Sequence, residues 1–235
     1  RVAEEVPGDV DVEEVPAELV VQVPVIREVL DALGIAIVGA AEAEADDVIG
    51  TLATGASGPV DVVTGDRDLF QLVDDEADVR VVYTARGISN LEVLTDAVVV
   101  AKYGIHARQY ADFAVMRGDT SDGLPGVAGV GEKTAMALLT EYGDLAGIEA
   151  AAADPGSAMK PALRARFAAA VDYLAVAPKV VEVVRDLPIA AVDARLRVPT
   201  AEQRATLDAL ARRWALGGSL DRALTALTGA AGAGA

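Results

Sequence analysis

One segment, Gly118 to Ala135, constrains this chain more than any other. Its sequence, GDTSDGLPGVAGVGEKTA, places Asp119 and Asp122 three residues apart, ahead of a glycine-rich turn that opens a helix near Glu132. Paired carboxylates suit a hard divalent cation, and glycine-rich turns with exposed amides suit phosphate groups. The combination predicts an enzyme, or the remnant of one, that acts on a phosphodiester.

The same segment contains a near match to a nucleotide-binding P-loop, which requires Gly, four residues and then Gly-Lys-Ser/Thr. Glu132 separates Gly131 from Lys133, so the spacing fails by one residue. A polar turn also precedes Gly126, where a P-loop would follow a hydrophobic strand. The pattern therefore argues against a nucleoside-triphosphate site.

Composition sets wide bounds. A chain of 235 residues that is 52% hydrophobic can bury a sizeable core, in one large or two small domains. It has no cysteine, which excludes disulfides and thiolate metal sites and agrees with a cytoplasmic protein. No apolar run is long enough to cross a membrane, so we expect no membrane partner.

The formal net charge is −17, which lowers the expectation of a nucleic-acid partner. The carboxylates of a metal site also count as negative until their cations bind, so acidity does not exclude DNA or RNA.

Apolar periodicity predicts strands that alternate with helices, followed by helices alone. This order is typical of an α/β sheet domain joined to a helical domain, here residues 1–117 and 118–228, with a disordered Gly/Ala tail at 229–235. We expect Trp214 in the core. The predicted strands are Ile35–Val38, Val60–Thr64 and Val79–Tyr83; the predicted helices are Glu18–Leu33, Glu44–Ala53, Leu69–Val73, Asp96–Tyr103, Ala107–Arg117, Glu132–Tyr142, Pro161–Val176 and Ala201–Trp214.

Acidic residues follow two of the predicted strands. Asp66 and Asp68 come directly after Val60–Thr64, and a second group, Glu44, Asp46 and Asp47, follows Ile35–Val38. Since ligands bind at the carboxyl ends of parallel strands, we expect both groups at one edge of the sheet, with Asp119 and Asp122 folded back over it.

Oxygen ligands without His or Cys favour Mg²⁺ or Mn²⁺, and two such ions about 4 Å apart can activate water and hold a phosphate. Carboxylates packed this closely repel one another, so the metal-free site is expected to be partly protonated or loose.

Each acid also has a plainer interpretation. Asp46 or Asp47 alone is more often a helix cap than a metal ligand, and an Asp-Arg-Asp sequence after a strand is a common helix start. Asp119 and Asp122 alone are most simply turn residues. Their joint occurrence with the glycine-rich turn favours the metal site.

Three segments in this order resemble the bacterial 5′–3′ exonuclease/flap endonuclease family, which includes the N-terminal nuclease domain of DNA polymerase I and its stand-alone relatives. The similarity runs from roughly Glu18 to Tyr142, and the third segment is the most specific. The segments are EADD (Glu44–Asp47), TGDRDL (Thr64–Leu69) and GDTSDGLPGVAGVGEKTA (Gly118–Ala135).

The resemblance implies a PIN-like (Rossmann-like), mostly parallel sheet core followed by an all-α helix-hairpin-helix domain. It implies a monomeric enzyme that uses two Mg²⁺ or Mn²⁺ ions to cut DNA bearing a 5′ end or a 5′ flap. Such an enzyme would act at the nucleoid, in DNA replication and repair. In this family the first metal would be held mainly by Glu44, Asp46 and Asp66, and the second by Asp68, Asp119 and Asp122. Asp47 would bind a metal directly or through a water molecule. The implied catalytic residues are Glu44, Asp46, Asp66 and Asp68.

The resemblance also implies that the hairpin Gly126–Gly131 and the following helix grip duplex DNA by its phosphates, with a potassium ion on hairpin carbonyls. The DNA-binding residues would be Gly126, Gly129, Gly131, Lys133 and Thr134. Lys160, Arg164 and Arg166 either extend this phosphate track or form a solvated helix face.

The family begins with two Asp-bearing strands and a basic helical arch, none of which precedes Arg1. Arg1–Ala17 resembles the family's segment C-terminal to the arch, so we expect an N-terminally truncated nuclease from a stand-alone protein. A non-catalytic DNA-binding fragment, a PIN-type ribonuclease and the nuclease domain of a DNA polymerase stay open as alternatives.

Overall fold

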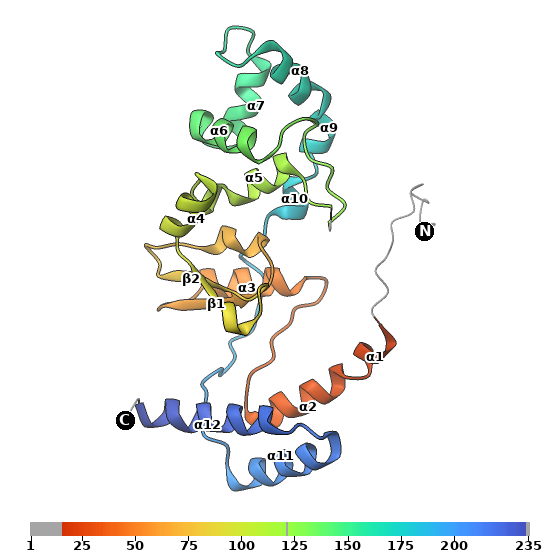
Figure 1. Ribbon diagram of the computed structural model, residues 1–235, viewed down its shortest axis with the longest axis vertical. Helices are drawn as coiled ribbons and strands as arrows, with labels where there is room; N and C mark the ends of the chain where they lie inside the picture. The colour runs from red at the N-terminus through yellow and green to blue at the C-terminus, as the bar shows by residue number, and fades with distance from the viewer. Residues whose placement is uncertain (1–15, 121, 234–235) are drawn as a thin grey trace. The chain divides into compact units, whose positions relative to one another are not determined.

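A computed structural model describes residues 16–120 and 122–233 (Figure 1). Most of the segment Arg1–Ala17 therefore lies outside the described residues, as does Ser121. The chain forms two compact units, one made of residues 40–189 and the other of residues 1–39 with 190–235. The predicted boundary between Arg117 and Gly118 thus falls inside the first unit.

The larger unit contains a small mixed sheet in the order β1-β2-β3. β1 (Val60–Thr64) pairs in parallel with β2 (Val79–Tyr83), and β2 pairs antiparallel with β3 (Glu92–Leu94). The first two strands are confirmed. The sequence did not reveal β3, because three residues are too few to show an alternating pattern.

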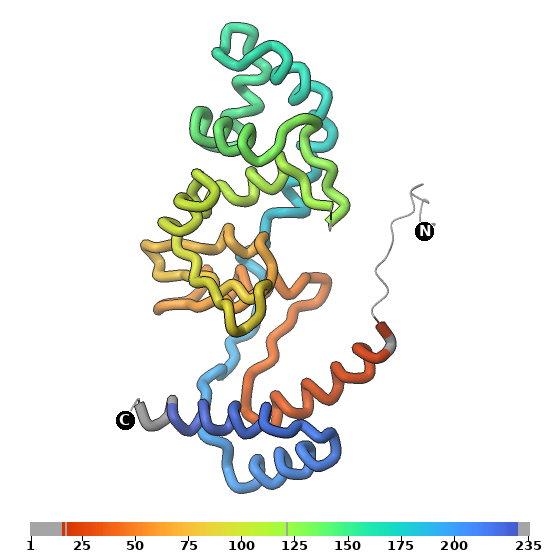
Figure 2. Tube along the Cα trace, viewed as in Figure 1, coloured from red at the N-terminus to blue at the C-terminus, as the bar shows by residue number. Residues whose placement is uncertain are grey.

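Helices make up most of the rest of this unit (Figure 2). The predicted helices Glu44–Ala53, Asp96–Tyr103 and Glu132–Tyr142 are confirmed to within one residue at each end. Leu69–Val73 forms a 3-10 helix, Ala107–Arg117 divides into a 3-10 turn and an α-helix, and Pro161–Val176 breaks at Ala170. The helices at 145–153 and 178–181 were not predicted. The elements are α3 (Ala45–Thr54), η1 (Asp68–Leu72), η2 (Ile88–Asn90), α4 (Asp96–Tyr103), η3 (Ala107–Gln109), α5 (Tyr110–Arg117), α6 (Glu132–Tyr142), α7 (Leu145–Ala153), α8 (Pro161–Ala169), α9 (Val171–Leu174) and α10 (Pro178–Val181).

An aromatic cluster joins the sheet to the helices. The Phe70 ring on η1 meets the Tyr83 ring edge-on at a centroid distance of 5.1 Å, and it lies 5.1 Å from Tyr110 on α5. Phe113 packs 5.7 Å from Tyr110 and is fully buried. Because Phe70 lies two residues after Asp68, this packing fixes the loop that presents the acids after β1.

The smaller unit consists of α1 (Ala17–Val20), α2 (Val23–Leu33), α11 (Ala201–Trp214) and α12 (Gly218–Ala233). Its core is leucine-rich and includes Leu33, Leu207 and Leu224. The predicted helix Glu18–Leu33 is interrupted before α2, whose first turn contains a proline.

Three sequence predictions fail in this unit. Ile35–Val38 forms no strand in the described structure, because its backbone has no strand to pair with. α12 runs to Ala233 through most of the predicted Gly/Ala tail, since alanine is the strongest helix former. Trp214 is 42% exposed rather than core, with the Arg213 guanidinium 4.8 Å from its ring centroid.

Candidate metal and nucleic-acid site

Six of the seven acids predicted as metal ligands line one pocket of about 590 Å³ in the larger unit. We call it the acidic pocket. Asp119 is not among its lining residues, although it lies three positions before Asp122, which is. The lining residues are Glu42, Glu44, Asp46, Asp47, Asp66, Asp68, Asp122, Lys179, Val180, Val181, Glu182, Val183 and Val184.

The start of α3 supplies the first group of acids. Glu44 is the N-cap residue, and its backbone amide donates to Oδ2 of Asp47 at 3.3 Å. Asp47 therefore caps the helix, as its plainer interpretation predicted. Burial, followed by repulsion from Asp66 and then Glu44, raises the pKa of Asp46 above its ordinary value.

The loop after β1 supplies the second group. The amide of Asp66 donates to Oγ1 of Thr64 at 2.9 Å, and the amide of Asp68 donates to Oδ1 of Asp66 at 2.9 Å. These bonds form a tight turn that presents both carboxylates at the carboxyl end of β1. Burial, followed by the charges of Asp66 and Asp122, raises the pKa of Asp68 to about 6.

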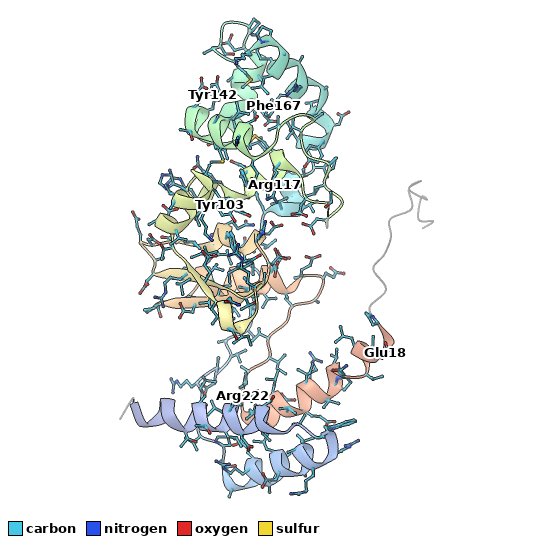
Figure 3. All side chains as sticks on the ribbon, viewed as in Figure 1. Glu18, Tyr103, Arg117, Tyr142, Phe167 and Arg222 are labelled. Carbon is cyan, nitrogen blue, oxygen red and sulfur yellow. The ribbon has the colours of Figure 1, made fainter. Side chains whose placement is uncertain are left out.

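A loop closed on itself supplies the third group. Asp119 and Leu124 exchange two backbone hydrogen bonds, of 2.9 and 2.7 Å. Arg117 lies at the end of α5 (Figure 3), and its Nη2 is 3.2 Å from Oδ2 of Asp119. This ion pair ties the loop to α5. Burial, followed by the charge of Asp119, raises the pKa of Asp122.

The donor set of the acidic pocket fits a hard divalent cation, because its charged ligands are carboxylates and His106, the sole histidine, is not in its lining. In the described part of the chain, no three acidic or histidine side chains stand close enough to form a ready metal site. Burial first, and then repulsion from neighbouring carboxylates, raises the pKa values of Asp46, Asp68 and Asp122, and a bound cation would offset that repulsion.

The far wall of the acidic pocket is a segment that sequence reasoning missed, Lys179–Val184, which we call the strap. The amide of Val184 donates to Oδ1 of Asp47 at 2.9 Å. The side chain of Gln71 is buried; it donates to the carbonyl of Val181 at 2.8 Å and accepts from the amide of Val183 at 3.1 Å. A glutamine inside the apolar run of η1 was the one sequence signal for this contact.

The glycine hairpin lies between α5 and α6, drawn in green in Figure 2. Gly126 has φ +70° and Gly129 has φ +72°, a region that favours glycine. Val127, between these glycines, and Val130, directly after Gly129, are both buried and anchor the turn. Gly131 is the N-cap of α6, so the amides of the first turn, including those of Lys133 and Thr134, lie at the positive end of the helix dipole.

Arg166 on α8 occupies part of this hairpin. Its Nη1 donates to the carbonyl of Gly129 at 2.8 Å. A guanidinium charge at this distance disfavours a second cation on the same oxygen. The hairpin residues therefore fit the implied potassium ion poorly at the Gly129 carbonyl.

Among the described residues, no helix combines the length and the apolar character that a membrane span needs.

Two family models cover most of the chain. The "5′-3′ exonuclease, N-terminal resolvase-like domain" matches residues 11–104, and the "5′-3′ exonuclease, C-terminal SAM fold" matches residues 105–204. Together they account for the sheet with its acids and for the helices with the hairpin.

Individual relatives agree with the family models. A 5′-3′ exonuclease of Streptomyces coelicolor is 57% identical over 229 residues, which are 97% of this chain and 75% of the relative. A 5′-3′ exonuclease of Mycobacterium tuberculosis is 52% identical over 80% of this chain and 62% of its own length. DNA polymerase I of Mycobacterium tuberculosis is 45% identical over 78% of this chain, but only 20% of that polymerase is covered.

Solved structures share the fold. The catalytic core of Rad2 in complex with DNA substrate aligns with a TM-score of 0.56 at 16% identity, covering 91% of this chain and 69% of that one. The bacteriophage T5 5′-exonuclease with bound zinc aligns with a TM-score of 0.51 at 19% identity, covering 79% of this chain and 59% of that one. Taken with the family models and the 57% identity, the fold and the acidic pocket place this chain in the 5′-3′ exonuclease family of nucleases.

Proposed function

We propose that this chain forms the metal-binding and duplex-binding parts of a structure-specific DNA 5′–3′ exonuclease or flap endonuclease. The observation that supports this most is the acidic pocket, in which α3, the loop after β1 and the Asp119–Asp122 loop bring carboxylates together from distant parts of the sequence. The chain spans 75% and 62% of the two exonucleases named above, so the activity of the whole protein is part of the proposal.

The proposed reaction is hydrolysis of a phosphodiester with two Mg²⁺ or Mn²⁺ ions. When bound, such ions lower the pKa of water and offset the charge of the phosphate. Glu44, Asp46 and Asp66 would hold mainly the first ion, and a second set, Asp68, Asp119 and Asp122, would hold the other. Asp47 is the least suited, since each of its oxygens already accepts a backbone hydrogen bond.

The hairpin would hold the duplex that flanks the cleaved strand. Backbone amides at the start of α6, together with Lys133 and Thr134, offer donors to phosphate oxygens without reading bases. Recognition would therefore depend on the form of the DNA and on its 5′ end or flap. We propose that the protein acts as a monomer in the cytoplasm, at the nucleoid, in DNA replication and repair.

Cleavage of a 5′-flap DNA in Mg²⁺ tests this proposal, with binding of the same DNA measured in parallel. Asp66→Ala removes a proposed ligand of the acidic pocket. Asp61→Ala is its matched control, because Asp61 lies on β1, just before the loop that contains Asp66, and forms only an exposed ion pair with Arg80. We expect the parent and Asp61→Ala to cut at similar rates and Asp66→Ala to lose at least about 10²-fold, the scale of a lost transition-state contact.

A second candidate is DNA binding without cleavage. It is favoured by the spacing of the acids in the pocket, since no three of the described acidic or histidine side chains are arranged closely enough to hold a metal ion. It predicts that the parent binds the flap DNA and leaves it intact. An RNA flap of the same sequence distinguishes a PIN-type ribonuclease from the DNA candidates, because only the ribonuclease would cut the RNA in preference to the DNA. A folded chain that neither binds nor cleaves the DNA would contradict both DNA candidates.

A further inference from the structure

The guanidinium of Arg166 packs against Gly129 of the glycine hairpin. Its Nη1 donates to the carbonyl of Gly129 at 2.8 Å. A β-carbon added at Gly129 would lie 2.7 Å from that Nη1 and 2.8 Å from Cζ. Glycine at this position therefore leaves the room that the guanidinium occupies, in addition to supplying the positive φ.

We propose that Arg166 is the resident cation of the hairpin, in place of a monovalent metal ion, and that it binds a backbone phosphate of duplex DNA. This inference rests on the proposed function for its DNA half. The charge of Arg166 neutralises the Gly129 carbonyl dipole, which would otherwise repel an approaching phosphate.

Arg166 can contact the Gly129 carbonyl and a DNA phosphate at the same time. A guanidinium has five N–H donors in a planar fork, and only one of them is used by the Gly129 carbonyl. The side chain is exposed, so the remaining donors are open to a partner from solvent. A phosphate that approaches the hairpin can accept from these donors.

Arg164 on the same helix provides the contrast. Its Nη1 donates to the carbonyl of Asp154 at 2.8 Å, so its guanidinium holds the loop before α8 instead of the hairpin. Both arginines thus bond one backbone carbonyl, but only Arg166 does so at the hairpin. Arg164→Ala is therefore the matched control for Arg166→Ala.

The experiment measures binding of a duplex DNA with a 5′ overhang, in KCl and in NaCl of equal ionic strength. Ca²⁺ replaces Mg²⁺, and a gel confirms that the DNA stays intact. We expect the parent to bind equally in the two salts, within about twofold. Arg166→Ala should bind about 3- to 10-fold more weakly, with the slope of log K against log salt reduced by about 0.9, the value for one lost phosphate contact on duplex DNA.

Two further variants sharpen the result. Arg164→Ala should stay within about twofold of the parent and keep the parent's salt slope. Arg166→Lys retains the charge without the fork, so it should keep the slope while losing part of the affinity. A parent that binds DNA markedly more tightly in KCl than in NaCl, or an Arg166→Ala variant that matches Arg164→Ala, would overturn the proposal.

Thermal unfolding without DNA tests the cation separately. We expect the parent to have the same unfolding midpoint in KCl and NaCl, and a midpoint of the parent that rises only with KCl would contradict a resident arginine. If the parent binds no DNA in either salt, the proposed function fails and the phosphate half of this inference with it, while the unfolding comparison still decides which cation holds the hairpin.

Discussion

The backbone amide of Val184 donates to Oδ1 of Asp47 at 2.9 Å, across 137 residues of sequence. The other oxygen of the same carboxylate accepts the amide of Glu44. One side chain therefore fixes both the start of α3 and the strap that faces it. The two walls of the acidic pocket are held together through a residue that sequence reasoning assigns to a metal.

Asp47→Ala is expected to lower the free energy of unfolding by about 1–2 kcal/mol, because it removes a helix cap and leaves the Val184 amide without its acceptor. Urea denaturation measures the loss. Asp61→Ala should cost under about 1 kcal/mol, since its partner Arg80 and Asp61 itself are about half exposed. Equal stability of Asp47→Ala and the parent would show that the strap is held by other contacts.

Gln71→Ala should destabilise the protein more than Asp47→Ala, by about 2–4 kcal/mol. Gln71 is 5% exposed, and without it the carbonyl of Val181 and the amide of Val183 lose their partner in a buried setting. Gln22→Ala is the control, because Gln22 lies exposed in the turn between α1 and α2 and its side chain bonds only the carbonyl of Glu18. Similar unfolding midpoints for the two variants would contradict a structural role for Gln71.

Gly50→Ala tests how closely α3 approaches Val183 and Val184, the last two residues of the strap. A β-carbon at Gly50 would overlap Cγ1 of Val183 and lie 2.9 Å from the carbonyl oxygen of Val184, so one of the two segments must shift. We expect a loss of about 1–3 kcal/mol, the usual cost of overpacking. Gly58→Ala meets no atom within 4 Å and should be neutral or slightly stabilising.

Much of the larger unit could be predicted because its signals are local. Alternating β-branched residues mark Val60–Thr64 and Val79–Tyr83, and α6 is flanked by two cap glycines, Gly131 and Gly143. The carboxylates after β1 agree with the general rule that ligands bind at strand ends.

The features that could not be predicted depend on contacts between residues far apart in the sequence. Ile35–Val38 has the composition of a strand, but a strand needs a neighbour, which the sequence cannot specify. The strap contacts α3 and η1 through backbone amides and carbonyls, which every residue has, so no residue type marks it. The Arg166–Gly129 contact likewise joins residues 37 positions apart through a carbonyl oxygen.

The metal-free protein should lose stability as the pH rises through about 6. Burial, then Asp66 and Asp122, raises the pKa of Asp68 from 3.8 to about 6, and the pKa values of Asp46 and Asp122 shift in the same direction. A carboxyl group whose pKa is raised in the folded state binds its proton more tightly there than in the unfolded chain. Its stabilising contribution is therefore complete below about pH 4 and is lost as it ionises near pH 6.

Asp68→Asn imitates the protonated form at every pH. In EDTA we expect it to match the parent near pH 4 and to exceed it by roughly 1 kcal/mol near pH 7.5, a value reduced for solvent screening of a half-buried group. Denaturant unfolding at the two pH values measures the difference. Added Mg²⁺ should stabilise the parent more than the variant at the higher pH, because only the parent has an ionised carboxylate at this position to bind the cation. A difference between variant and parent that does not change with pH would show that ionisation of Asp68 has no part in the stability of the acidic pocket.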